Sequence, residues 1–193
     1  MNTYLMKLGA HSLDSAPEEA KLLLQAAQKQ YGTIPNMYGR MAQLPGVLST
    51  YLHGYEAYRK QSMFTPPELE VVLLTISREN GCEYCVAAHS MVAKMMSHVP
   101  QDILEAVRSG SPIPDARLQA LAAFTKAMLD KRGNPTPDDV EPLLKAGFSE
   151  HHILGVILAI AVKTLSNYTN HVFHTPVDAA FRPFDWKKPA KAA

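Results

Sequence analysis

Two cysteines and a histidine stand close together near the middle of the chain. Cys82 and Cys85 are the only cysteines among 193 residues, and His89 follows Cys85 by four positions. In a helix, residues four apart share a face, so the imidazole would lie beside the Cys85 thiol. An imidazole there can take the thiol proton or hold the thiolate as an ion pair. The spacing therefore predicts a nucleophile at Cys85, a base at His89 and a resolving thiol at Cys82.

The surrounding sequence favours a thiolate at this place. Gly81 is a normal residue for ending a helix, so the cysteines are expected in the first turn of the next one. Backbone N–H groups in a first turn lack partners within the helix, and the helix dipole favours negative charge there. Closely spaced cysteine pairs can have thiol pKa values well below the ~8.5 of a free cysteine.

A fourth residue, Glu70, stands on the helix expected before the cysteines. That helix has a hydroxyl cap at Thr65, proline in its first turn and Glu68 in a capping position, so capping does not need Glu70. A hairpin of two helices can bring Glu70 beside Cys82 and His89, where it would orient the imidazole and pass a proton. Alternatively, Glu70 is a charge at the edge of an apolar face.

Other interpretations of the cysteine pair remain open. The cysteines can be structural, or Cys82, Cys85 and His89 can be three ligands of a zinc ion whose fourth ligand comes from elsewhere. A c-type haem site is excluded, because Val86 and not histidine follows the second cysteine. A thioredoxin-like site needs a βαβ pattern, which the chain lacks.

The composition limits the class of protein. Hydrophobic residues make up 47% of the chain and charged residues 19%, with a net charge of +1. A sizeable core is therefore expected, and neither a nucleic-acid partner nor a disordered chain is indicated. The first fifteen residues lack the apolar segment of a secretory signal, and the apolar run 153–162 is too short to span a bilayer. A close cysteine pair without a disulfide framework favours the cytoplasm.

Helical periodicity and capping signals recur, whereas strand signals hardly occur. We expect an all-α fold of about eight helices in one domain, residues 1–193, with a core motif region at about 45–131 and an extended C-terminal arm at about 175–193. Helical segments are predicted from a capping box at 15–18 to about 31, and at about 36–41, 45–61, 65–80, 82–96, 100–109, 115–131, 136–147 and 149–170.

Polar residues gather near the end of the last predicted helix. Asn167, Asn170, His171 and His174 can line a pocket or bind a neighbouring subunit, but hydrogen bonding at the helix end explains them equally well. Trp186, in the proline-rich tail, is expected to dock this arm on another helix or subunit.

Glu70, an eleven-residue gap and the pattern Cys82-x-x-Cys85-x-x-x-His89 together resemble the signature of the AhpD-like alkylhydroperoxidases, in the carboxymuconolactone decarboxylase superfamily. The long N-terminal region and the ending at 167–174 resemble its peroxidase-related branch. One position departs from the family pattern. Characterised members often carry a histidine directly before the second cysteine, whereas this chain has Tyr84 and so lacks one potential proton carrier.

The resemblance implies an AhpD-like helical fold in a homo-oligomer, a trimer or hexamer, that reduces hydrogen peroxide or organic peroxides. Cys85 would be oxidised to a sulfenic acid, Cys82 would resolve it to a disulfide, and His89 with Glu70 would form the proton relay. The reductant would be a dithiol such as a dihydrolipoamide-bearing protein. No metal, haem or flavin is expected, nor a nucleic-acid or membrane partner.

Two alternatives to a peroxidase stay open. The first is another enzyme activity, either a dithiol–disulfide oxidoreductase or a further activity of the superfamily. The second is a non-catalytic redox-sensing or zinc-binding module.

Overall fold

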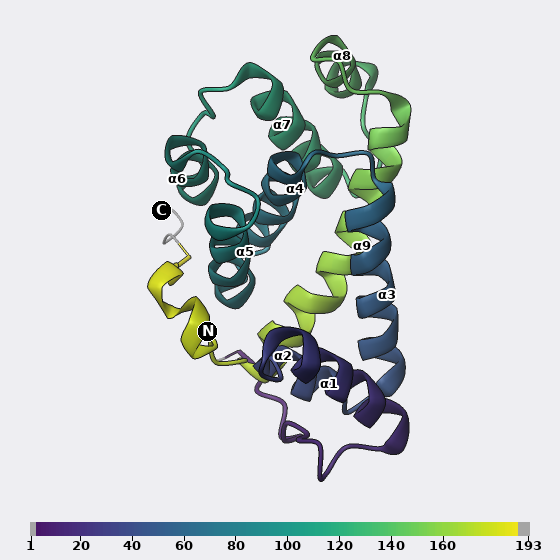
Figure 1. Ribbon diagram of the computed structural model, residues 1–193. Helices are drawn as coiled ribbons and strands as arrows, with labels where there is room; N and C mark the ends of the chain where they lie inside the picture. Colours follow the sequence, from purple (N-terminus) through teal and green to yellow (C-terminus); the bar gives the residue numbers. More distant parts are fainter. Residues whose placement is uncertain (1–2, 189–193) are drawn as a thin grey trace.

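The computed structural model describes residues 3–188, which form nine α-helices and one 3-10 helix and no strand (Figure 1). The all-α prediction is confirmed. In chain order the elements are α1 (Glu18–Tyr31), α2 (Asn36–Met41), α3 (Pro45–Gln61), α4 (Pro66–Glu79), α5 (Glu83–Met95), α6 (Gln101–Ser109), α7 (Ala116–Asp130), α8 (Pro137–Lys145), α9 (Glu150–Phe173) and the 3-10 helix η1 (Ala179–Phe184).

Helix α4 lies at the centre of the fold. A capping box fixes its start: the Thr65 side chain accepts from the first-turn backbone, and the Glu68 carboxylate accepts from the Thr65 N–H at 2.8 Å. Every residue from Glu68 to Ser77 is buried, and α4 packs against α5, α6, α7 and α9. A helix that is buried on nearly all sides fixes the positions of its neighbours, including α5 with the two cysteines.

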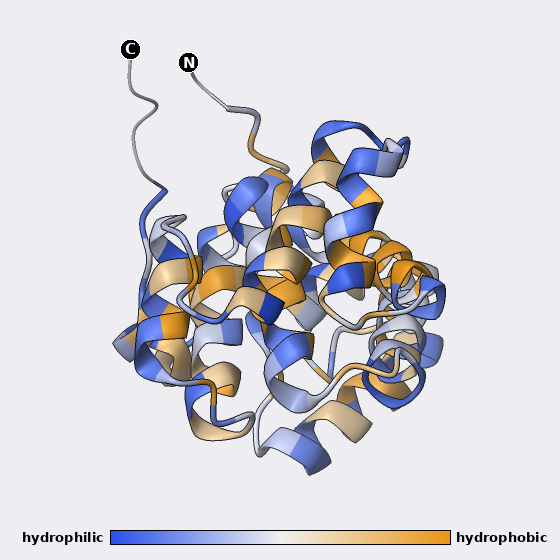
Figure 2. Ribbon diagram, turned by 90° about the horizontal axis from the view of Figure 1, so that it is seen from above, coloured by the Kyte–Doolittle hydropathy of each residue, from blue (hydrophilic) through white to orange (hydrophobic). Residues whose placement is uncertain are grey.

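The buried apolar side chains form three clusters. One joins α1, α2 and α3 to both cysteines and to Val162 of α9. The second lies among α3, α4, α7, α8 and α9, and the third among α4, α5, α6 and α7. Figure 2 shows many of these apolar residues gathered in the middle of the helices, with polar residues around the edges. The cysteines therefore lie where the N-terminal helices meet α5 and α9.

The last helix, α9, is longer than the sequence indicated. It continues past the expected end near Asn170 to Phe173, where His174 adopts a left-handed conformation with φ of 47° and ends it. The apolar run 153–162 belongs to this helix of 24 residues, which by length and composition alone could cross a membrane. Here α9 packs along α3 and against α4 and α5 (Figure 1), and the core helix of a folded domain passes the same test.

The start of α1 differs from the predicted capping box. The helix begins at Glu18 with Pro17 in the N-cap position and no side-chain cap. The Ser15 hydroxyl instead accepts the backbone N–H of Ser12 at 3.0 Å, in the turn before the helix. Serine hydroxyls often bond to nearby backbone in this way, which competes with capping.

The C-terminal segment is not fully extended as predicted. Residues 179–184 form η1, which lies beside α5 (Figure 1), and residues 189–193 lie outside the described part of the chain. The Phe181 ring packs edge-on against Tyr84 of α5, with 5.9 Å between ring centroids. This contact with α5 explains why residues 179–184 are helical, although their sequence has no helical pattern of apolar residues.

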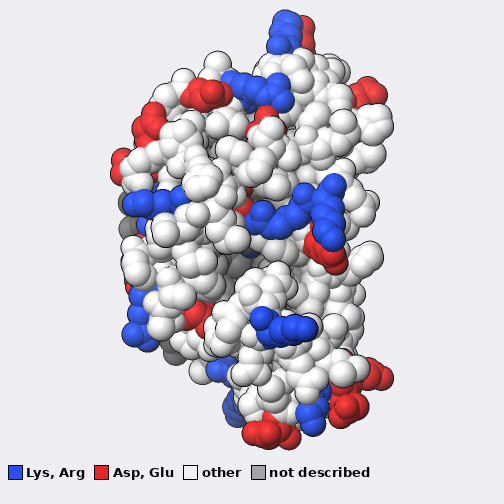
Figure 3. All heavy atoms as spheres, viewed as in Figure 1, with Lys and Arg blue, Asp and Glu red and all other residues white. Residues whose placement is uncertain are grey.

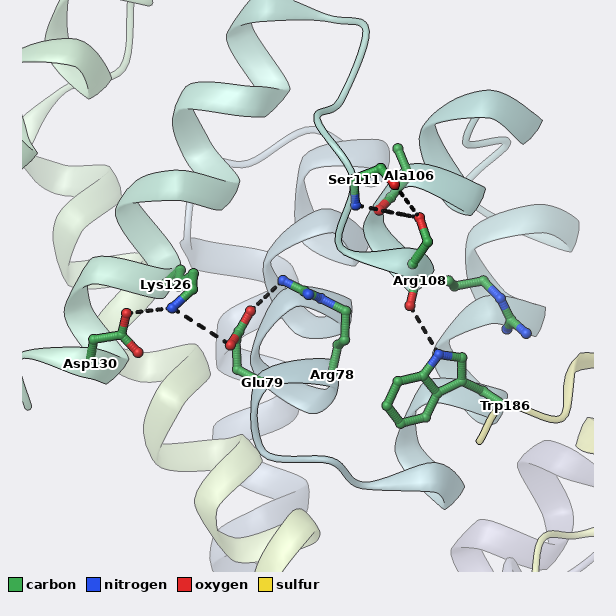
Figure 4. Close-up of polar contacts among 9 residues, drawn as sticks. Arg78, Glu79, Ala106, Arg108, Ser111, Lys126, Asp130 and Trp186 are labelled. Carbon is green, nitrogen blue, oxygen red and sulfur yellow. Dashed lines mark hydrogen bonds and ion pairs between the residues drawn. The ribbon is translucent and has the colours of Figure 1, made fainter. Parts of the chain in front are cut away.

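Trp186 docks this segment onto α6, which confirms the predicted docking. Its indole is buried, and its Nε1–H donates to the Arg108 carbonyl at 2.9 Å (Figure 4). The same view shows ion pairs of Glu79 with Arg78 and of Lys126 with Asp130. The ion pair of Lys126 with Glu79 connects α7 to α4. On the face shown in Figure 3, lysine and arginine lie among aspartate and glutamate, as is typical of a solvated surface.

Candidate active site

The connection between α4 and α5 places the cysteines. Gly81 has a φ of +69°, a conformation that glycine adopts without strain. Its N–H bonds to the Arg78 carbonyl at 2.9 Å, and the Cys82 N–H bonds to the Ser77 carbonyl at 2.9 Å. These two bonds are the pair that defines a Schellman ending. The chain can therefore reverse after Gly81 and start α5 at once.

Both cysteines lie at the start of α5. Cys82 is the N-cap residue, with its carbonyl accepting from the Val86 N–H at 3.0 Å, and Cys85 is the third helical residue. Their side chains are free thiols that are only 1% and 2% exposed. The predicted place in a first helical turn is confirmed, and there the helix dipole favours a thiolate.

Glu70 and His89 meet across the α4–α5 pair. His89 Nδ1 lies 2.9 Å from Glu70 Oε2, and the Arg59 guanidinium of α3 forms an ion pair with Oε1 of the same carboxylate. Glu70 is completely buried, so the interpretation of it as a charge at the edge of a face is wrong. The hairpin brings Glu70 to His89 as expected, whereas its hydrogen bonds within residues 3–188 include none to Cys82.

The charge state of this pair determines the histidine tautomer. Burial alone would raise the pKa of Glu70, but the hydrogen bond from His89 and the charge of Arg59 lower it, so the carboxylate is ionised. Burial, together with the charge of Lys163, lowers the pKa of His89. A carboxylate only accepts hydrogen bonds, so a neutral His89 carries its proton on Nδ1. Its Nε2 is then free to accept a proton.

The polar group near the end of α9 divides into two parts. Asn170 Nδ2 lies 3.3 Å from the Cys85 sulfur and 3.8 Å from the Cys82 sulfur, and it also contacts Met37 of α2. Asn167 accepts from the Asn80 amide at 2.9 Å, next to the α4–α5 turn. Both asparagines therefore belong to the site or to its support.

Within residues 3–188, neither histidine of that group has a side-chain hydrogen bond to a sulfur atom. His174 Nε2 lies 3.4 Å from the Thr3 hydroxyl, which joins the end of α9 to the N-terminal segment. Burial lowers the pKa of His171, which is therefore favoured in its neutral form.

Lys163 of α9 is a residue that the sequence analysis missed. Its side chain is 1% exposed, and within residues 3–188 its Nζ has no hydrogen-bond partner. Asn167 Nδ2 and Asn170 Oδ1 also lack partners in this described part. Positions 163, 167 and 170 share one face of a helix. The only signal in the sequence is a single lysine within an otherwise apolar stretch of α9.

The two thiols differ in their electrostatic surroundings. Burial alone would raise the pKa of Cys85, but a hydrogen bond from Cys82 and the charge of Lys163 lower it well below its usual range. The hydrogen bond to Cys85 and burial raise the pKa of Cys82. These opposite directions favour Cys85 as the thiolate and Cys82 as the thiol that donates to it.

Tyr84 ties the C-terminal segment to the site helix. Its hydroxyl donates to Asp178 Oδ2 at 2.5 Å, and Asp178 also accepts from the Asn36 backbone N–H at 3.1 Å. Burial and the Asp178 charge raise the pKa of Tyr84, so it keeps its proton. Tyr84 thus anchors the C-terminal segment to α5.

Arg59 is a second residue that the sequence analysis missed, because a charged residue near the end of α3 gives no sign of its partner.

The zinc interpretation gains no support from the geometry. Among residues 3–188, no group of three or more His, Cys, Asp or Glu side chains is arranged to hold a metal ion.

Residues 45–127 match the model of the carboxymuconolactone decarboxylase family. Three solved structures share the fold over nearly all of both chains. An uncharacterised peroxidase-related protein from Ralstonia eutropha JMP134, described as an alkylhydroperoxidase AhpD core, is 21% identical over 91% of this chain and 93% of its own, with a TM-score of 0.80. A peroxidase-related protein from Silicibacter sp. TM1040 is 20% identical over 94% and 95%, with a TM-score of 0.76.

The third structure is a cysteine-to-alanine variant of the debrominase Bmp8 in complex with 2,3,4-tribromopyrrole. It is 18% identical over 95% of this chain and 97% of its own, with a TM-score of 0.72. A comparison with curated proteins gives no match.

Proposed function

We propose that the chain, whose residues 45–127 match the carboxymuconolactone decarboxylase family and whose fold is AhpD-like, is a two-cysteine thiol peroxidase for hydrogen peroxide or organic hydroperoxides. The observation that carries the proposal is the unequal pair of thiols. Cys85 has a lowered pKa and Cys82 a raised one, although the two stand within one helical turn. A nucleophile and a resolving thiol need this difference, because the thiolate is the reactive form.

In the first step the Cys85 thiolate attacks the terminal oxygen of the hydroperoxide. An S–O bond forms and the O–O bond breaks, which leaves a sulfenic acid on Cys85 and an alkoxide that takes up a proton to become an alcohol. The sulfur is oxidised and the peroxide is reduced by two electrons. Because Cys85 reacts as a thiolate, the proton for the alkoxide comes from solvent; the free Nε2 of His89 relays it to the alkoxide, while Glu70 holds the ring.

In the second step the Cys82 sulfur attacks the Cys85 sulfenic acid. The new bond is the Cys82–Cys85 disulfide, and the sulfenic oxygen leaves as water with the Cys82 proton. Asn170 lies within reach of both sulfur atoms and can stay in contact with them through the cycle. An external dithiol, of the dihydrolipoamide class, then reduces the disulfide by thiol–disulfide exchange. Such a cycle fits a cytoplasmic homo-oligomer, a trimer or hexamer, that needs no metal or flavin.

Single replacements of the two cysteines test the proposal. Cys85→Ser is expected to abolish peroxide consumption under a dithiol, whereas Cys82→Ser should still consume one equivalent of peroxide and stop at the sulfenic acid. A sulfenic acid trap, dimedone, followed by intact mass would identify that product. Peroxide turnover that survives Cys85→Ser unchanged would reject the assignment.

A dithiol–disulfide oxidoreductase is the second candidate, because both thiols are free and adjacent. Their burial argues against a folded protein disulfide as substrate, since the almost inaccessible sulfur atoms leave room only for a small peroxide or a narrow dihydrolipoamide arm. Insulin reduction measured beside peroxide consumption separates the two. A bromopyrrole belongs in the same assay, because one relative in fold is a debrominase. Cys85-dependent turnover of insulin or bromopyrrole without peroxide turnover would replace the peroxidase proposal.

A further inference from the structure

Lys163 is a buried lysine whose ammonium has no hydrogen-bond partner among residues 3–188. Burying an isolated ammonium is costly, and proteins normally pair such a group with an anion and hydrogen bonds. Within the described residues, Lys163 Nζ has no such partner although the side chain is only 1% exposed. A side chain that is an anion only when deprotonated, such as a thiol, could pair with the Lys163 ammonium.

The groups around Lys163 leave one such partner. The start of α5 brings the two cysteines against α9: Asn170, two turns after Lys163 on the same face, reaches the Cys85 sulfur at 3.3 Å and the Cys82 sulfur at 3.8 Å. Among residues 3–188 the buried glutamates already have partners: Glu70 is bound by Arg59 and His89, and Glu68 by Arg117 and the Thr65 backbone. The anion that remains is the sulfur of Cys85.

We propose that Lys163 is the counter-ion that holds Cys85 as a thiolate, with the Asn170 amide as its neutral helper at the same sulfur. This deepens the proposed function and rests on it. Lys163 is a positioning residue here, since it acts on the reaction through the charge state of Cys85.

The alternative counter-ion, a protonated His89, conflicts with the site. Burial and the charge of Lys163 both lower the pKa of His89, so the imidazole is neutral. A neutral imidazole can accept a proton but cannot balance a negative charge. The lysine and the histidine therefore have different roles: Lys163 stabilises the Cys85 thiolate, and His89 passes a proton to the alkoxide.

The test measures the Cys85 pKa without any peroxide. Thiolate absorbance near 240 nm is followed against pH, and the Cys85→Ser spectrum is subtracted. Lys163→Met should raise the midpoint by about 1–3 pH units, the range that one nearby opposite charge accounts for. Lys163→Arg should keep the midpoint close to that of the unchanged protein. Ser166→Ala, a buried position of α9 whose hydroxyl bonds only to its own helix, is the matched control and should not shift it.

A second readout separates charge from packing. The His89 imidazole, followed by proton NMR, should have a higher pKa in Lys163→Met, because one positive neighbour is gone. Lys163→Gln keeps the length and polarity of the side chain and should shift both groups in the same way, so it replaces the methionine variant if that does not fold.

Unchanged midpoints of Cys85 in Lys163→Met and Lys163→Gln would overturn the proposal, even if the protein reduces peroxides. Raised midpoints in a protein that reduces no peroxide would support the Lys163 assignment and reject the peroxidase function instead. The two failures are thus distinguishable.

Discussion

Glu70 and Lys163 are both buried charges beside the same histidine, yet the fold treats them differently. Glu70 has two partners from two other helices, Arg59 and His89, whereas Lys163 has none among residues 3–188. The charge of Glu70 is balanced in every state of the site. The charge of Lys163 is balanced only when Cys85 is ionised. We therefore assign Glu70 a mainly structural role and Lys163 a role in the reaction.

Replacing His89, the partner of Glu70, should have the largest effect on the rate of peroxide reduction. His89→Asn takes away the free Nε2 and leaves Glu70 with Arg59 alone, so peroxide reduction should slow by about 10²–10⁴-fold, the usual contribution of a general base. Single-turnover oxidation at pH 7 measures the change. His98→Asn, at a position that no proposed step uses, is the control. A rate equal to that of the unchanged protein would remove His89 from the relay.

Breaking the paired charge itself should mainly reduce stability. Glu70→Gln weakens the bonds to Arg59 and His89, and the free energy of unfolding should fall by roughly 2–4 kcal/mol, since hydrogen bonds to a charged group contribute about 1.5–3 kcal/mol each. Urea unfolding at pH 7 measures this. Glu56→Gln, in an exposed pair with Lys60, should change stability much less. Equal effects of the two changes would mean that the burial of Glu70 is not what matters.

The unpaired charge should make stability depend on pH. The folded protein lowers the pKa of Cys85, while the unfolded chain has the ordinary thiol value of about 8.5. Between these two values the unfolded chain binds one more proton, so stability rises with pH and is lost as the pH falls through the folded pKa. Each unit of lowering contributes about 1.4 kcal/mol.

Chemical unfolding of the reduced protein at several pH values tests this dependence. Cys85→Ser should remove this part of the slope, and Lys163→Met should remove much of it. The raised pKa of Cys82 affects stability only at pH values above the ordinary thiol pKa, so it does not contribute to the slope below that value. Parallel stability curves for all three proteins would contradict a Lys163–Cys85 pair.

Local signals allowed much of the fold to be predicted from the sequence. The bounds of α2 and α3 and the capping box at Thr65 are confirmed, because prolines and caps act within one helical turn. Ser15 failed as a cap, because its hydroxyl had a competing partner in the preceding turn. The 3-10 helix near Phe181 depends on contacts with α5, which its own sequence does not encode.

The site residues also differ in how far they could be predicted from local sequence. The spacing of Cys82, Cys85 and His89 is local, and it placed both cysteines at the start of one helix and His89 one turn after Cys85. The pairing of Glu70 with His89 needed only the adjacent hairpin, so it could be anticipated. Lys163 approaches from a helix far along the chain, and its role depends on packing that no local pattern records.

The most direct test of the whole account is stoichiometric oxidation of the reduced protein. One equivalent of hydrogen peroxide or an alkyl hydroperoxide is added, and free thiols and intact mass are measured within seconds. The account predicts loss of both thiols and a mass lower by two hydrogen atoms, because Cys85 reacts and Cys82 closes the disulfide. Two thiols that persist with an unchanged mass would contradict it.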